Sequence, residues 1–160
     1  QANCCLEQMI KRITNPAEFK KLLDDIFVLI KNIEDRNEAH FLKHNKEYIS
    51  NAFAHKHLLV WDFFVWANEG DDGNFDAMIA FVNEKNEKFG EEIFSEYLWL
   101  SDNPRVGHKL LGVALKFAKE KEFKYVTMNC VFAHPKAEKV ARFYKKMGFV
   151  KDSESYIAEL

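Results

Sequence analysis

The chain has 160 residues, and its 23 basic and 25 acidic side chains leave a formal net charge of −2. That length suits a single domain over residues 1–160. Hydrophobic residues make up 48% of the sequence and aromatic residues 14%, which excludes a disordered chain. The near-neutral charge argues against nucleic acid or an anionic membrane surface as a partner.

The positions of Cys and His favour neither a disulfide framework nor a metal site. Cys4, Cys5 and Cys130 lack disulfide-framework and zinc-ligand spacing, so we expect a reduced cytoplasmic protein with Cys130 as a core residue. His40 and His44 lack the following glutamate of a metalloprotease motif and are expected on the surface. No apolar run reaches the length of a membrane span, and no signal peptide is visible.

Two helices are predicted in the first third of the chain, after a short strand at 9–14. Asn15-Pro16 is typical of a helix start, with Asn as the cap and Pro in the first turn. Apolar residues spaced by three and four predict one buried helix face: Phe19, Leu22, Leu23, Ile26, Phe27, Ile30 and Ile33. A second, weaker helix is predicted from about His40 to Ala54.

Three strands separated by turns are predicted next, at 58–66, 76–82 and 93–100. Aromatic and β-branched residues dominate them, and the intervening segments 68–74 and 83–90 have turn composition. Successive strands on short turns predict an antiparallel meander.

The remaining chain alternates between helix and strand. After a turn at 101–107 we expect a helix at 108–121, a strand at 123–132, and a helix from His134-Pro135 to Met147-Gly148. One or two short strands are expected at 149–160. The order (β)ααβββαβαβ(β) predicts an α/β fold with a mixed, mostly antiparallel sheet flanked by helices.

Two segments resemble motifs of the GCN5-related N-acetyltransferase (GNAT) superfamily. Residues 105–111, Arg-Val-Gly-His-Lys-Leu-Leu, are similar to the end of the loop Q/R-x-x-G-x-G/A and the helix that follows it. Residues 141–149, Ala-Arg-Phe-Tyr-Lys-Lys-Met-Gly-Phe, are similar to A-x-x-(F/L)-Y-x-x-x-G-F. The resemblance covers about residues 58–160 and implies a GNAT-like fold.

The resemblance implies that acetyl-CoA is the co-substrate and that its pyrophosphate binds at the first motif. A helix N-terminus offers unpaired N–H groups to an anion, and glycine permits a close backbone approach. Arg105 and Lys109 add positive charge. The implied cofactor-binding residues are Leu100, Ser101, Arg105, Val106, Gly107, His108 and Lys109.

Transfer of an acetyl group to an amine needs a base, an oxyanion site and an acid for the leaving thiolate. The resemblance assigns the acid to Tyr144, which also fits a core position on its helix. A backbone N–H near residues 99–101, where the strand is expected to splay, would stabilise the oxyanion. Glu96, a carboxylate within an aromatic strand, is the candidate base. Alternatively, Glu96 lies on a solvated face, and Asp62 or a water molecule serves instead.

The chain departs from the family pattern at the first motif. Arg105 replaces the first glycine, Asp102 occupies the Q/R position, and the loop is about three residues shorter. We expect an N-acetyltransferase that acts on a primary amine of a small molecule or a protein. Asp62, Glu69, Asp71 and Glu96 favour a cationic acceptor. The alternative is an inactive binding or assembly module, for which the aromatic segment 61–66 offers a surface for a partner or a homodimer.

Overall fold

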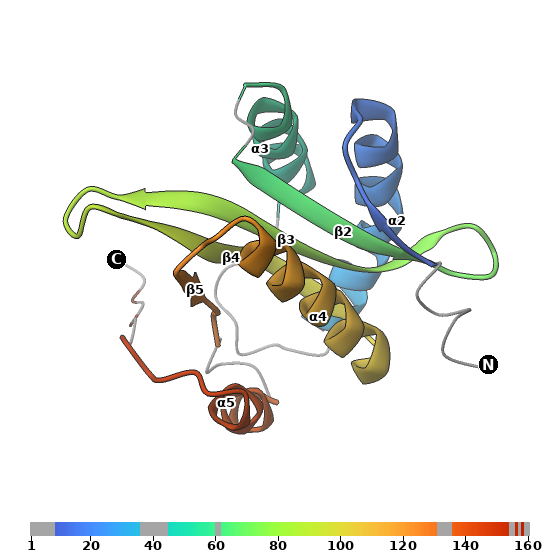
Figure 1. Cartoon of the computed structure of the whole chain (residues 1–160). Coiled ribbons are helices and arrows are strands. Elements are labelled where there is room, and N and C mark those ends of the chain that lie inside the picture. The colour runs from blue at the N-terminus through green and yellow to red at the C-terminus, as the bar shows by residue number, and fades with distance from the viewer. Residues whose placement is uncertain are drawn as a thin grey trace. The chain divides into compact units, whose positions relative to one another are not determined.

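The computed structural model describes residues 9–35, 45–59, 62–130, 136–153, 156 and 158. The chain forms two compact units, Gln1–Asn129 and Cys130–Leu160. The single domain thus stays a prediction. The mixed α/β fold is confirmed: the first unit contains a sheet with helices on both faces (Figure 1).

The sheet of the first unit has five strands in the order β1-β2-β3-β4-β5. The strands are β1 (Ile10–Arg12), β2 (Phe63–Glu69), β3 (Phe75–Asn86), β4 (Glu91–Ser101) and β5 (Tyr125–Thr127). The first three pairings are antiparallel, and those among β2, β3 and β4 form the predicted meander. In contrast, β4 pairs with β5 in parallel. The helix between β4 and β5 supplies the crossover that a parallel pairing requires.

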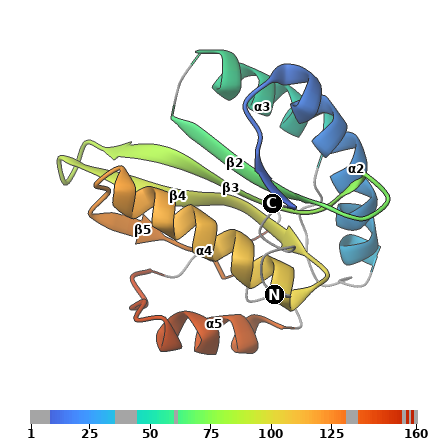
Figure 2. The same cartoon turned by 45° about the vertical axis from the view of Figure 1, so that its right-hand side comes forward.

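Three helices cover the two faces of this sheet. They are α2 (Pro16–Asp35), α3 (Lys46–Leu59) and α4 (Pro104–Glu120). Figures 1 and 2 show α2 and α3 on one face and α4 across the other. Leu22 and Ile26 of α2 pack on Met78 and Ala80 of β3 in one core. Phe81 and Phe94 stack at 4.1 Å on the α4 side, where Phe94 also meets the ring of Phe117.

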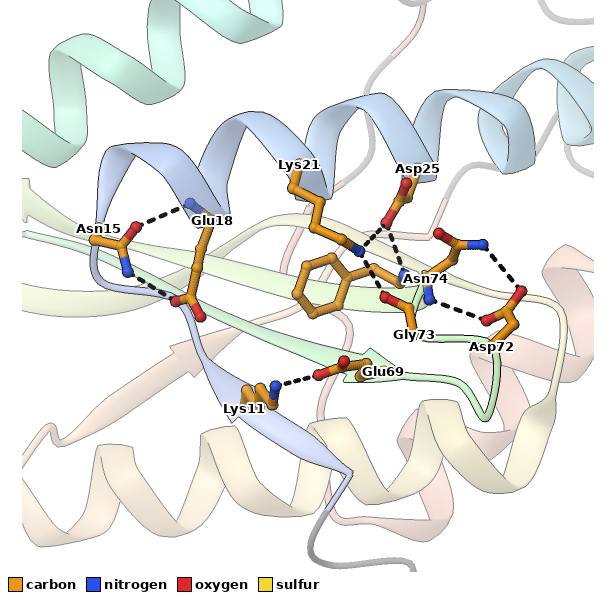
Figure 3. Close-up of polar contacts among 10 residues, drawn as sticks. Lys11, Asn15, Glu18, Lys21, Asp25, Glu69, Asp72, Gly73 and Asn74 are labelled. Atoms are coloured by element: carbon orange, nitrogen blue, oxygen red, sulfur yellow. Dashed lines mark hydrogen bonds and ion pairs between the residues drawn. The ribbon is translucent and has the colours of Figure 1, made fainter.

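The start of α2 follows the prediction from Asn15-Pro16. Glu18 donates its N–H to Asn15 Oδ1 at 2.9 Å, and Asn15 Nδ2 donates to the Glu18 carboxylate at 3.0 Å (Figure 3). This exchange satisfies a donor that the first turn would otherwise leave without a partner.

Polar contacts join α2 to the β2–β3 turn. Lys21 Nζ donates to Asp25 at 2.8 Å and to the Gly73 carbonyl at 2.7 Å (Figure 3). The same Asp25 oxygen accepts the N–H of Phe75 at 2.9 Å. Lys11 and Glu69 form an ion pair between β1 and β2. The contacts of Lys21 and Asp25 hold the β2–β3 turn against α2, and the ion pair links the two neighbouring strands.

Several predicted boundaries were wrong. Leu58 and Leu59 end α3, and β2 starts at Phe63, because a short apolar run does not distinguish helix from strand. The predicted turn at 83–90 shrinks to 87–90, since the polar residues 83–86 extend the β3–β4 ladder. Residues 36–44, which include His40 and His44, lie outside the described residues.

In the second unit, α5 spans Ala137–Lys146. Gly148 ends it with φ 89°, and Phe149 N–H donates to the Tyr144 carbonyl at 3.0 Å, which confirms the predicted glycine cap. The predicted helix start at His134-Pro135 lies outside the described residues. Residues 149–153, 156 and 158 form no strand, so the prediction of final strands fails for them. A short segment at the end of a chain does not by itself specify a pairing partner in a sheet.

Candidate functional site

An irregularity in β4 lies at the centre of the candidate site. Ala80 pairs with Leu98 but Phe81 pairs with Glu96, so Tyr97 is an extra residue in β4. Such a bulge bends a strand and turns a side chain to a new direction. Tyr97 and Leu98 both pack against the core beneath α2. Glu96 therefore shares the α4 side of the sheet with its partner Phe81.

The pairing of β4 with β5 ends next to this bulge. The parallel ladder joins 93–95 to 125–127, and its last pair is Ser95 with Thr127. We expected the sheet to open near residues 99–101, but pairing already stops one residue before Glu96. The end of this ladder is hereafter called the fork.

Glu96 lies at the fork and is half-buried. Its Oε2 accepts the main-chain N–H of Asn129 at 2.7 Å, and its carbonyl accepts Asn129 Nδ2 at 3.1 Å. Burial raises the pKa of Glu96 to about 7, against the opposing effect of the Asn129 hydrogen bond. Glu96 is therefore partly shielded from solvent, on the face of the sheet that α4 covers.

Asp62, the other candidate base, lies in the turn before β2 rather than inside a strand. Its carbonyl accepts the N–H of Asn83 at 2.7 Å. Glu69 and Asp71 belong to the other end of the sheet. Glu69 pairs with Phe75, six residues along β3 from the partner of Glu96, which is roughly 20 Å of strand. These two carboxylates do not line the fork.

The first of the two motifs, residues 105–111, lies inside a helix. We predicted a helix start at about His108, but α4 begins at Pro104 with Asn103 as its cap. Asn103 Oδ1 accepts the N–H of Arg105 at 3.0 Å, and the Asn103 carbonyl accepts that of Gly107 at 2.9 Å. Because proline has no N–H, Val106 is the first-turn donor that no hydrogen bond occupies in the described part of the chain.

Gly107 faces the sheet rather than an open anion site. It is buried, and a Cβ at this position would lie 3.3 Å from Ser101 Cβ and 3.5 Å from Trp99 Nε1. The close packing of α4 on β4 therefore favours glycine, because a Cβ would make its neighbours shift by a few tenths of an ångström. Leu100 packs into the core on the α2 side, so its side chain does not reach the start of α4.

Two basic side chains, Arg105 and Lys109, lie at the start of α4, close in sequence to the exposed carboxylate of Asp102. Arg105 and His108 are exposed and Lys109 is half-buried. Among the described residues, neither Arg105 nor Lys109 forms an ion pair with an acidic side chain. The groups at this helix end that could bind an anion are thus two side-chain cations and the Val106 N–H.

Tyr144 belongs to the second unit. It is buried on α5 and packs against Phe143 and Phe149, with ring centroids 6.1 and 5.7 Å away. Its role in proton transfer stays a prediction. Cys130 is half-buried, and its Sγ donates to the Ala137 carbonyl at 3.3 Å.

Asn129 is the residue that the sequence did not indicate. It lies 33 positions from Glu96, and only the parallel pairing of β4 and β5 brings the two together. In the described ranges, no group of three or more His, Cys, Asp or Glu side chains is arranged to hold a metal ion. Nor does any described helix have the length and apolar character to cross a membrane.

Comparison with known proteins identifies the fold. No family model matches the chain, and no curated protein matches it. A ribosomal-protein-alanine N-acetyltransferase from Brucella melitensis biovar Abortus 2308 is similar in structure, with a TM-score of 0.61 and 13% identity over 94% of this chain and 99% of that one. An aminoglycoside acetyltransferase from an uncultured soil metagenomic sample, in complex with sisomicin, has a TM-score of 0.64 and 15% identity over 97% and 99%. The chain therefore has the fold of the GNAT acetyltransferases.

Proposed function

We propose that the chain is an N-acyltransferase that moves an acetyl group from acetyl-CoA to a primary amine. The observation that carries the proposal is Glu96, a half-buried carboxylate at the fork with a pKa of about 7. A base is most effective when its pKa lies near the working pH. The likeness in fold to acetyltransferases supports the same reaction class.

The residues at the start of α4 fit the phosphates of acetyl-CoA through side chains more than through the backbone. Arg105 and Lys109 would hold the pyrophosphate, and Val106 N–H would add one main-chain donor. The bound thioester supplies an activated acyl carbon and a thiolate leaving group. The hydrogen bonds of Asn103 occupy donors that could otherwise face an anion, so we expect the affinity to depend strongly on the two cations.

In this proposal the carboxylate of Glu96 takes the proton from the acceptor ammonium before attack. A main-chain N–H of β4 beyond the bulge stabilises the oxyanion, and Tyr144 donates a proton to the departing thiolate. One carboxylate at the fork attracts a cationic amine at short range and does not select among amines. The acceptor is therefore any primary amine, small or protein-borne, that reaches Glu96.

The rival function is a binding or assembly module without catalysis. The start of α4 favours this function, because Pro104 has no N–H and Asn103 occupies further N–H donors that an anion site would need. In that case the chain keeps the fold and lacks the cofactor.

A thermal-shift titration with acetyl-CoA separates the two functions. Saturating cofactor at 100 times its dissociation constant adds about 2.7 kcal/mol of stability. Arg105→Ala and Lys109→Ala should each weaken the shift. Lys116→Ala is the matched control, because Lys116 is an exposed lysine later on α4, 4.0 Å from Glu120. No shift at millimolar acetyl-CoA contradicts the enzyme.

A further inference from the structure

Asn129 makes two contacts with one residue. Its main-chain N–H and its side-chain Nδ2 both donate to Glu96, at 2.7 Å to Oε2 and at 3.1 Å to the carbonyl. Neither contact belongs to the β4–β5 ladder, which ends at Ser95 and Thr127. Both therefore tie the chain after β5 to β4 beyond the last ladder pair.

The fork has a second cross-strand contact that needs no charge. Ser95 Oγ and Thr127 Oγ1 lie 2.8 Å apart in the last ladder pair. A neutral pair of this kind joins two strands without the desolvation cost of a carboxylate. Joining β4 to β5 thus does not require an ionisable residue at position 96, and the use of Glu96 points to chemistry.

The two carboxylate oxygens of Glu96 are not equivalent. Oε2 is held by Asn129 N–H, whereas Oε1 has no hydrogen-bond partner in the described ranges. A hydrogen bond to one oxygen restricts the orientation of the carboxylate and leaves the other oxygen able to accept a proton.

Resting on the function proposed above, we propose that Asn129 is a positioning residue for the general base: its side chain anchors the chain after β5 on Glu96, so that its main-chain N–H holds Oε2 and Oε1 remains available to the acceptor amine.

The surroundings of Glu96 allow this contact to be tested. Burial is the main cause of the raised pKa, and no charged side chain of the described residues contributes. The partner of Glu96 on β3 is Phe81, α4 presents Phe117 to the same core, and Tyr97 of β4 packs on the opposite face. The Asn129 hydrogen bond alone opposes burial, so weakening it should raise the pKa further.

The experiment compares Asn129→Ala with Thr127→Val. Asn129→Ala removes the Nδ2 anchor, and Thr127→Val removes the hydroxyl pair without touching Glu96. We expect the acid limb of the kcat/KM profile to move up by about one pH unit in Asn129→Ala, which is roughly a tenfold loss at pH 6 and little loss at pH 9. Thr127→Val should keep the wild-type limb.

A carboxyl ¹³C titration of glutamate-labelled protein tests the inference without any substrate, with Glu96→Gln to assign the signal. The pKa of Glu96 should rise in Asn129→Ala, and also in Asn129→Leu, which keeps roughly the size of Asn, adds no charge and cannot donate. An unchanged pKa in a folded variant overturns the inference. A raised pKa in a protein that transfers no acyl group supports the contact with Glu96 and contradicts the enzyme. A uniform loss of activity at every pH assigns Asn129 a purely structural role.

Discussion

Replacing Glu96 with glutamine should stabilise the protein at alkaline pH. The folded pKa of Glu96 is about 7, above the ordinary value of 4.5, so folding favours the neutral carboxyl. Its contribution to stability is fully present below pH 4.5 and is lost as the pH rises through 7. Glutamine remains neutral throughout and can still accept the Asn129 N–H.

The magnitude follows from the two pKa values. A pKa raised from 4.5 to about 7 corresponds to about 3 kcal/mol at about 1.4 kcal/mol per pH unit. Because Glu96 is only half-buried, solvent screening reduces this value, and about 2 kcal/mol is expected. For a chain of this size, that difference raises the Tm by roughly 4–8 °C.

Urea unfolding followed by tryptophan fluorescence measures the effect from pH 4.5 to pH 8.5. The variant should match the wild type at the acid end and exceed it by about 2 kcal/mol at the alkaline end. Glu92→Gln, at an exposed position of the same strand, is the control and should show no such trend. A Glu96→Gln variant that gains nothing at pH 8.5 would refute the assigned burial of the carboxylate.

Two further predictions concern the packing of the helices. Gly107→Ala places a Cβ 3.3 Å from Ser101 Cβ and should cost about 1 kcal/mol net of the gain in helix propensity, whereas Gly112→Ala, with open space around it, should stabilise α4 by about 0.5–1 kcal/mol. Equal effects of the two substitutions on urea unfolding contradict the close approach of α4 to β4. Asp25→Ala loses two hydrogen bonds and should cost about 1–3 kcal/mol, against at most ~1 kcal/mol for the exposed Asp24→Ala. The reverse order of stabilities would contradict the contacts that hold the β2–β3 turn on α2.

Local sequence signals predicted that the helices exist, but they placed the start of α4 wrongly. The Asn-Pro pair at residues 15–16 marked the start of α2 correctly. The same pair at 103–104 marks the start of α4, but residues 101–107 were assigned to a turn, so the helix was predicted to start only at His108. Helix capping is a local property of a few residues, so the second pair carried the same information as the first.

The candidate base was visible in the sequence, but its surroundings were not. A carboxylate among aromatic residues singled out Glu96, and simple alternation then assigned it to a solvated face. The bulge at Tyr97 breaks that alternation, and α4 covers the face on which Glu96 lies. Its contact with Asn129 joins residues 33 positions apart, which no local pattern encodes.

The pH dependence of acetyl transfer tests the central claim most directly. Thiol release from acetyl-CoA would be followed from pH 5.5 to pH 9.5 with a panel of primary amines: an alanine-terminated peptide, a lysine peptide, an aminoglycoside and a small diamine. The proposal predicts a rate that rises with an apparent pKa near 7 in the wild type and no such limb in Glu96→Gln. Acetyl transfer by Glu96→Gln at the wild-type rate and with the wild-type profile, or no amine-dependent thiol release from the wild type with any acceptor, would contradict it.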